Sequence, residues 1–271
     1  MRKPSTSAGI TMPATRASAP DDPPDEIRAA MRPTDVFTTP VRRLIKPTTP
    51  RTVHLLNIPA LAAPVQAEAT TEADFVRLAA LCPTVKHIAA QPCTLLLSGQ
   101  AYTPDYRVEC HSGAVSYWEV KLEKRFDDYR ALFNRAAQYL HEQGERFYAV
   151  SNVSLRFRGH HLHAELLHRY GKAEPAEADV ARVLTEARGH PNGCSAVRLA
   201  ARARAPLELI YHLLASRRLT FKRRIGEADL ITLPEFLEKE DDLLLASWLD
   251  VSPWRTNAGT HARAAGRQVG P

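Results

Sequence analysis

Cysteine is scarce in this chain, and long apolar runs are missing from it. The four cysteines among 271 residues form no C-x-x-C pair and no zinc-finger spacing, which argues against a structural zinc site. Buried thiols in a reduced cytosol are the simple interpretation. No run approaches the roughly eighteen apolar residues of a membrane helix. We therefore expect a cytoplasmic protein without a membrane partner.

Acidic residues are fewer than basic ones, 30 against 36, so the formal net charge is +6. The basic start of the chain is not followed by the apolar core of a secretory signal. With 44% hydrophobic and 24% charged residues, the composition is that of an ordinary globular protein with one large or two small domains. The positive balance favours an anionic partner such as nucleic acid.

Residues 1–55 differ in composition from the rest of the chain. Eleven of the twenty prolines precede Val65, among many Ser, Thr and Ala residues. Such a segment buries too little apolar surface to offset the entropy lost on ordering, so we expect a flexible arm. It serves either as a basic arm along a phosphate backbone or partner surface, or as a solubilising tail. The basic residues at its downstream end include Arg42, Arg43 and Lys46.

Three acidic residues and a lysine in the middle of the chain have a pattern that suits phosphodiester cleavage. Glu119 and Lys121 lie two apart in a β-rich run, so they share one face of a strand while Val120 faces the core. Cleavage requires an activated water and stabilisation of the leaving oxygen, which divalent cations held by carboxylates supply. We expect Glu72, Asp105 and Glu119 to hold the cation and Lys121 to assist water or phosphate. The alternative is an ordinary strand with two solvated charges.

The surrounding sequence, residues 56–155, predicts one α/β unit. Apolar positions recur at helical spacing in the two expected helices, whereas the expected strands are short and rich in branched and aromatic residues. Ser98-Gly99 signals a turn. We expect a helix at 72–82, extended segments within 85–97, strands at 105–108 and 115–121, a helix at 126–143 and a strand at 147–151.

A proline-preceded acidic residue, followed about a dozen residues later by Glu-x-Lys, resembles the motif of the PD-(D/E)XK nucleases. The fuller series resembles TnsA, the endonuclease subunit of a heteromeric bacterial transposase, most strongly over residues 66–155. The matching segments are Glu72-Ala-Asp-Phe, Cys82-Pro-Thr-Val, Gln91-Pro, Tyr102-Thr-Pro-Asp-Tyr and Glu119-Val-Lys.

The TnsA resemblance implies an α/β (α+β) restriction-endonuclease-like core that cleaves the non-transferred strand at transposon ends. It places the active site at Glu72, Asp105 and Lys121, with Glu119 as the second acid of the motif and Gln91 nearby. The implied cofactor is Mg²⁺, with Mn²⁺ as a substitute. The implied partners are transposon-end DNA, an integrase-type, TnsB-like transposase subunit and an AAA+, TnsC-like ATPase regulator, all in the bacterial cytoplasm.

Residues 156–235 predict a mostly α, winged-helix-like C-terminal domain. Between residues 156 and 225, fourteen Lys or Arg face six Asp or Glu, so the positive balance of the chain lies here. Helical patterns at 161–170, 177–188, 195–204 and 206–217 precede two short β-like runs around a glycine. In a winged helix, a helix enters the major groove and the hairpin grips phosphate, although such modules also bind proteins. The candidate DNA or partner contacts are Arg217, Arg218, Lys222, Arg223 and Arg224.

Residues 236–271 close the chain. The apolar spacing in 234–249 suggests an amphipathic helix for a partner, and we expect a disordered tail from Ser252. Two other functions stay open for the whole chain: an autonomous PD-(D/E)XK restriction or recombination nuclease, and a DNA-binding assembly module whose nuclease site has decayed.

Overall fold

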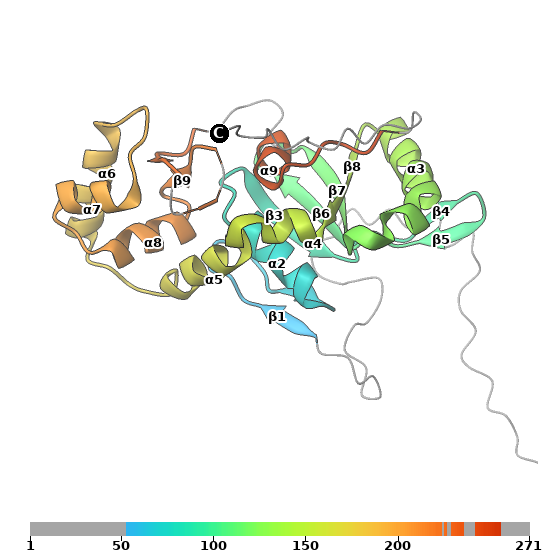
Figure 1. Ribbon diagram of the computed structural model, residues 1–271, viewed down its shortest axis with the longest axis horizontal. Helices are drawn as coiled ribbons and strands as arrows, with labels where there is room; N and C mark the ends of the chain where they lie inside the picture. Colours follow the sequence, from blue (N-terminus) through green and yellow to red (C-terminus); the bar gives the residue numbers. More distant parts are fainter. Residues whose placement is uncertain (1–52, 224, 227–228, 236–241, 256–271) are drawn as a thin grey trace, which may run out of the picture.

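The computed structural model describes residues 53–223, 225–226, 229–235 and 242–255 (Figure 1). It is a mixed α/β fold in which a four-stranded sheet is covered by a helix on each face and continues into a helical unit. None of the helices in these described ranges combines the length and apolarity needed to cross a bilayer. Residues 1–52 of the expected arm, with Arg42, Arg43 and Lys46, lie outside the described residues, as does Arg224. The end of the arm was placed too late, because β1 (His54–Leu56) already begins within residues 1–55.

The central sheet has the strand order β3-β6-β7-β8. The first three strands pair antiparallel, whereas β7 and β8 are parallel and are joined by a crossover through helix α3. The chain therefore runs helix, three sheet strands, helix and strand, with a small hairpin inserted after the first of those strands. The sheet strands are β3 (Val85–Ala90), β6 (Tyr106–Cys110), β7 (Val115–Lys121) and β8 (Arg146–Ser151).

Alternating side chains of these strands feed two apolar clusters, one on each face of the sheet. On one face Trp118 stacks on Tyr148 with ring centroids 4.3 Å apart and meets Phe75 of α2 at 5.2 Å. On the other face Phe133 of α3 packs against Phe147 at 5.6 Å. Burial on both faces explains why β7 is almost wholly enclosed. Helix α2 spans Thr70–Ala79 and helix α3 spans Phe126–Glu142.

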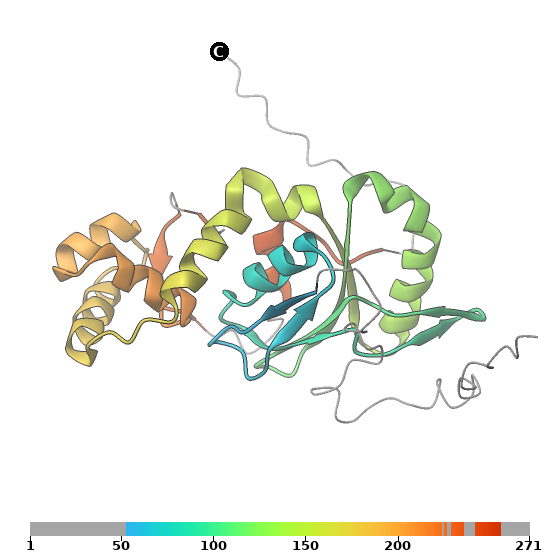
Figure 2. The ribbon, with the colours of Figure 1, turned by 90° about the horizontal axis from the view of Figure 1, so that it is seen from below.

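Two small hairpins flank the sheet. In the second hairpin, Leu97 pairs with Gln100 across Ser98 and Gly99, whose φ angles are 50° and 81°. Two central residues with positive φ make the type I′ turn that suits the twist of paired strands. Figure 2 shows this hairpin extending beyond the sheet. The strands are β1 (His54–Leu56) with β2 (Val65–Ala67), and β4 (Leu95–Leu97) with β5 (Gln100–Tyr102).

The expected elements of the α/β unit occur with small shifts at their ends. The one difference in kind is the extended stretch 85–97, which divides into β3 and β4. The division occurs at Gln91, whose φ of 45° turns the chain away from the sheet. A non-glycine residue with this conformation is uncommon and interrupts a strand. The four helices expected in the C-terminal part are present as α5 to α8.

The helical unit packs onto the same core as the sheet. Helix α5 lies between α2 and α8, and a two-stranded ribbon follows α8 (Figure 1). Cys194 adds an isolated antiparallel bridge to Ile231 of that ribbon. The elements are α4 (Asn152–Arg156), a 3₁₀ turn at Phe157–Gly159, α5 (His160–Tyr170), α6 (Glu177–Arg188), α7 (Ala196–Ala203), α8 (Leu207–Ala215), β9 (Thr220–Phe221), β10 (Ile231–Thr232) and α9 (Asp242–Leu249).

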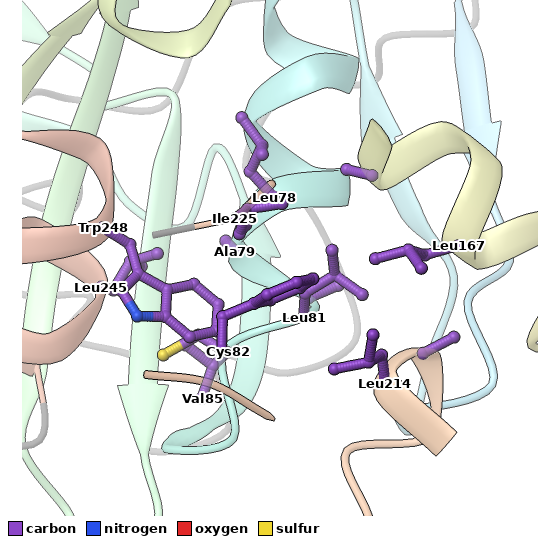
Figure 3. Packing of buried hydrophobic residues seen from close by; sticks show 14 of the residues in the cluster. Leu78, Ala79, Leu81, Cys82, Val85, Leu167, Leu214, Ile225, Leu245 and Trp248 are labelled. Atoms are coloured by element: carbon purple, nitrogen blue, oxygen red, sulfur yellow. The ribbon is translucent and has the colours of Figure 1, made fainter. Parts of the chain in front are cut away.

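The C-terminal helix has its partner within this chain, which corrects the expectation of a helix offered to another protein. Figure 3 shows Leu245 and Trp248 of α9 beside Cys82 and Val85, in the core that α2 also supplies. Beyond it, Trp254 packs at 5.2 Å from Phe133, so order continues past the expected start of the tail. The apolar spacing predicted a helix over 234–249; α9 covers Asp242–Leu249, and residues 236–241 lie outside the described residues.

Candidate functional site

Three of the four charged residues singled out in the sequence meet at the carboxyl end of β7. The ammonium of Lys121 lies 2.5 Å from Glu119 Oε1 and 3.6 Å from Asp105 Oδ2. Asp105 directly precedes β6, whose first residue, Tyr106, pairs with Trp118 on β7. Antiparallel register therefore carries Asp105 to the end of the strand that holds Glu119 and Lys121.

Glu119 is buried, with only 3% of its side chain exposed. Its Oε1 faces Lys121, and its Oε2 accepts a hydrogen bond of 2.7 Å from the hydroxyl of Tyr102. Both carboxylate oxygens are therefore held by a donor. Charge-assisted hydrogen bonds of this kind are stronger than those between neutral groups, so the orientation of the carboxylate is set.

Asp105 is fixed from two sides. Its Oδ2 accepts the backbone N–H of Val120 at 2.8 Å, and its backbone carbonyl accepts the N–H of Gln91 at 2.8 Å. Burial, followed by the nearby charge of Glu119, raises its pKa to about 7, although the Lys121 cation acts in the opposite direction. A substantial fraction of Asp105 therefore keeps its proton near neutral pH.

Glu72 approaches the same site from the first turn of α2. Its Oε2 accepts the backbone N–H of Glu68 at 2.8 Å and lies 3.5 Å from the hydroxyl of Tyr106. Burial, followed by repulsion from Asp105, raises its pKa to about 7. Two carboxylates from different parts of the chain thus have raised pKa values, partly because neighbouring carboxylates repel their negative charges. A constellation of this type is a candidate functional site.

Gln91 contributes through its backbone and its amide. The amide Nε2 donates to Glu68 Oε1 at 3.3 Å, while the N–H binds the Asp105 carbonyl. Gln91 is 9% exposed, and within the described part of the chain its Oε1 has no hydrogen-bond partner. Gln91 therefore connects Asp105 with Glu68, which in turn binds Glu72. Gln91 Oε1 is the buried acceptor that has no partner among the described residues.

Lys121 remains an ammonium group in this environment. Burial alone lowers its pKa, but the carboxylates of Asp105 and Glu119 outweigh that effect and raise the pKa above the ordinary lysine value. A protonated lysine cannot be a metal ligand. Its position suits neutralisation of a nearby anion or orientation of a water molecule.

The donor set fits a hard divalent cation. Carboxylate oxygens are the ligands that Mg²⁺ takes from proteins. Burial, followed by repulsion from a neighbouring carboxylate, raises the pKa of Glu72 and that of Asp105 to about 7, and a bound cation would offset this repulsion. In the side-chain arrangement described, no three His, Cys, Asp or Glu residues converge as a ready metal cluster. Lys121 instead serves as the counterion of Asp105 and Glu119.

Two neighbours of the site, Tyr102 and Glu68, were not assigned roles from the sequence. The Tyr102 hydroxyl donates to Glu119, which lies 17 positions later in the chain. Glu68 donates its backbone N–H to Glu72 and accepts from the amide of Gln91, which lies 23 positions after Glu68. A partial signal exists for Glu68, which lies four positions before Glu72. For Tyr102 the signal is proximity to Asp105, three positions downstream, within a segment that ends a hairpin.

Arg217 does not lie on an open surface, which corrects its expected place among the DNA or partner contacts. Its guanidinium donates to the carbonyls of Ala80, at 2.7 Å, and Val85. These carbonyls belong to the α/β unit, more than 130 positions earlier. Arg217 therefore links the C-terminal helices to the segment between α2 and β3.

The other cations near the ribbon are exposed. Arg218 lies 3.3 Å from Glu177, and the Lys222 ammonium donates to the carbonyl of Asn192 at 3.0 Å. Arg223 is also exposed, and its backbone N–H donates to Asp229. These weak surface contacts leave the three cations available for an anionic surface.

No protein-family model matches the chain, and no curated protein matches it either.

Proposed function

We propose that this chain is a metal-dependent DNA endonuclease with a PD-(D/E)XK-type site. The observation that carries the proposal is the meeting of Asp105, Glu119 and Lys121 at the end of β7, with Glu72 electrostatically coupled to Asp105 from α2. The element order around the sheet supports a restriction-endonuclease-like core. A buried carboxylate group beside a lysine suits the cleavage of an anionic substrate.

The roles of the residues follow from their surroundings. Glu72, Asp105 and Glu119 would hold Mg²⁺, which lowers the pKa of a bound water and stabilises charge on the leaving oxygen. Lys121, positively charged throughout the neutral range, attracts the phosphate and orients the water that attacks it. The Val120 amide and the Tyr102 hydroxyl keep the carboxylates of Asp105 and Glu119 in place for that purpose.

The C-terminal unit is proposed as a winged-helix-like module for DNA or for a partner protein. Three helices, α6 to α8, precede the β9–β10 ribbon, and the Cys194–Ile231 bridge adds a third short strand position between α6 and α7. Helix α8 packs against α5, where Tyr211 lies 5.5 Å from Tyr170. The exposed cations Arg218, Lys222 and Arg223 are therefore better candidates for phosphate contacts than the buried side of α8.

The reaction that fits these parts together with the TnsA-like motifs is cleavage of the non-transferred strand at transposon ends. An integrase-type, TnsB-like subunit would cut and join the other strand, and a TnsC-like AAA+ ATPase would regulate the assembly. This division of labour rests on the motif resemblance. The charge and geometry of the site support the chemical step alone.

A strand-specific cleavage assay tests the proposal. Labelled transposon-end DNA is incubated with Mg²⁺ and the protein, with and without an integrase-type, TnsB-like transposase subunit. We expect one strand to be cut in the mixture, and Asp105→Ala or Lys121→Ala to abolish that cut while remaining folded, as a cooperative thermal transition above the assay temperature would show. The exposed-site variant Lys124→Ala serves as the matched control for Lys121→Ala and retains cleavage.

Other outcomes of the assay identify the competing functions. Cutting by the protein alone would favour an autonomous restriction or recombination nuclease. Absence of cutting in every mixture, with DNA or partner binding retained, would favour an assembly module whose site has decayed. Folded Asp105→Ala and Lys121→Ala variants that still cut would refute the assigned site.

A further inference from the structure

We infer that Tyr102 is a positioning residue that holds the Glu119 carboxylate in the orientation needed to bind a divalent cation. The inference rests on the proposed function, because it concerns how one carboxylate of that site is presented. Tyr102 neither touches the reacting atoms nor supplies a ligand. It acts through the hydroxyl that it donates to Glu119 Oε2 at 2.7 Å.

The hydrogen bond is part of a two-sided grip on Glu119. Lys121 faces Oε1, and Tyr102 faces Oε2. A bound cation would replace Lys121 in balancing the charge of Glu119. The hydrogen bond from Tyr102 would then be the remaining contact that fixes the rotation of the carboxylate. Without it the buried carboxylate loses a donor, and the group becomes free to turn about its terminal bond.

Tyr102 is itself held firmly. It is the last residue of β5 and pairs with Leu95 across the hairpin. Its ring makes an edge contact with that of Phe147, with ring centroids 6.4 Å apart. The type I′ turn fixes the register of the hairpin, and the hydroxyls of Thr94 and Thr103 meet at 3.0 Å at its base. The phenol is therefore delivered to Glu119 by a paired hairpin whose base is closed by a side-chain hydrogen bond.

The hydrogen bond between Tyr102 and Glu119 is shielded from water. Both residues are buried, with 8% of Tyr102 and 3% of Glu119 exposed, so little water competes for the Glu119 oxygen that accepts from Tyr102. Neighbouring side chains orient metal ligands through enclosed hydrogen bonds of this kind.

The test compares cation binding by three variants of the full chain. Tyr102→Phe removes the hydroxyl alone, and Tyr117→Phe removes a buried hydroxyl from the same apolar cluster that does not contact Glu119. Glu119→Gln removes the charge of the ligand. Mn²⁺ is the probe, because its unbound fraction can be measured directly by electron paramagnetic resonance. Thermal unfolding in chelator reports whether each variant is folded.

We expect Tyr102→Phe to bind Mn²⁺ about 10-fold to 100-fold more weakly, the usual effect of removing a group that orients a metal ligand. Tyr117→Phe should bind like the unaltered chain, and Glu119→Gln should lose the tight site. Equal Mn²⁺ affinities for Tyr102→Phe and Tyr117→Phe would overturn the inference while leaving the proposed function intact. An unaltered chain that binds no Mn²⁺, or binds it no better than Glu119→Gln, would refute the proposed metal site and the inference with it.

A second variant covers the case in which Tyr102→Phe does not fold. Thr94→Val keeps the tyrosine but removes the Thr94–Thr103 contact that closes the base of the hairpin. We expect a smaller weakening of Mn²⁺ binding, several-fold, from a less firmly held phenol. Unchanged affinity in a folded Thr94→Val protein would then overturn the inference.

Discussion

Replacing Asp105 by asparagine is expected to stabilise the metal-free protein at alkaline pH. Burial, followed by the charge of Glu119, raises the pKa of Asp105 from an ordinary 3.8 to about 7. The ionised carboxylate is therefore less favourable in the folded chain than in the unfolded one. Asparagine has nearly the same shape, and its Oδ1 can still accept the Val120 N–H that Asp105 accepts at 2.8 Å.

The pKa shift sets an upper bound on the size of the effect. A rise of about 3 pKa units corresponds to about 4 kcal/mol of unfavourable ionisation, at about 1.4 kcal/mol per unit. The asparagine variant also loses the 3.6 Å ion pair with Lys121, although Lys121 keeps its contact with Glu119. We therefore expect Asp105→Asn to raise the free energy of unfolding at pH 8 by about 2 kcal/mol.

The sign of the pH dependence follows from the direction of the shift. Because the folded-state pKa lies above the unfolded one, the folded state binds more protons between about pH 4 and pH 7. The stabilising contribution is complete below about pH 4 and is lost as the pH rises through about 7. Glu72, whose pKa is raised to about 7 as well, acts in the same direction. The unaltered protein should lose stability over this range more steeply than Asp105→Asn.

Urea unfolding between pH 5 and pH 8.5, in chelator, measures both quantities. The exposed Glu174, in the loop between α5 and α6, provides the control substitution Glu174→Gln, for which we expect no comparable gain. Adding Mg²⁺ at pH 8 should stabilise the unaltered chain more than Asp105→Asn, because the ligand binds the folded state. An Asp105→Asn protein that is less stable than the unaltered chain at pH 8 would refute the argument from uncompensated charge.

The remaining predictions concern the C-terminal unit and use the same unfolding measurement. Arg217→Ala should cost about 2 to 4 kcal/mol, because the carbonyls of Ala80 and Val85 lose a charged donor. Arg204→Ala, at an exposed residue with a similarly positive φ of 49°, should change stability little. Equal losses in the Arg204 and Arg217 variants would show that the carbonyl contacts of Arg217 do not stabilise the fold. Gly193→Ala should cost about 3 kcal/mol, since its Cβ would lie 2.9 Å from that of Leu230 at a φ of 83°. Gly144→Ala has a φ of 76° but open space around it, so a loss of about 1 kcal/mol is expected there, and a loss as large as that of Gly193→Ala would contradict the steric explanation.

Local sequence patterns predicted the parts of the site that lie on one strand. Glu119 and Lys121 share a face of β7 because side chains alternate along a strand, and Val120 lies in the opposite apolar cluster as expected. The turn at Ser98 and Gly99 was also predictable, since glycine readily adopts a positive φ. Such features depend only on neighbouring residues, so a short stretch of sequence is enough to predict them.

The contacts that hold the site together could not be predicted in this way. Tyr102 reaches Glu119 only because the hairpin folds back beside the sheet, and Gln91 reaches Glu68 only because its positive φ ends β3. Both contacts depend on chain reversals whose direction is set by packing. A hydroxyl or amide has no periodic pattern that identifies its partner. The sequence therefore identified Glu72, Asp105, Glu119, Lys121 and Gln91. It did not identify Tyr102 and Glu68, which contact three of them.

Charge counting has a related weakness, which bears on the proposed binding of DNA by the C-terminal unit. The excess of Lys and Arg beyond residue 155 suggested a large cationic surface, yet Arg217 and Arg156 have partners in the α/β unit. Arg217 binds backbone carbonyls, and Arg156 pairs with the buried Asp74 at 2.8 Å. A cation that is held within the fold contacts no phosphate and releases no counterion from DNA. Each such cation therefore reduces the slope of log affinity against log salt concentration by about one unit. The slope for the proposed DNA binding should therefore correspond to the number of exposed cations around the ribbon. It should be smaller than the slope expected from the total number of Lys and Arg residues in the unit.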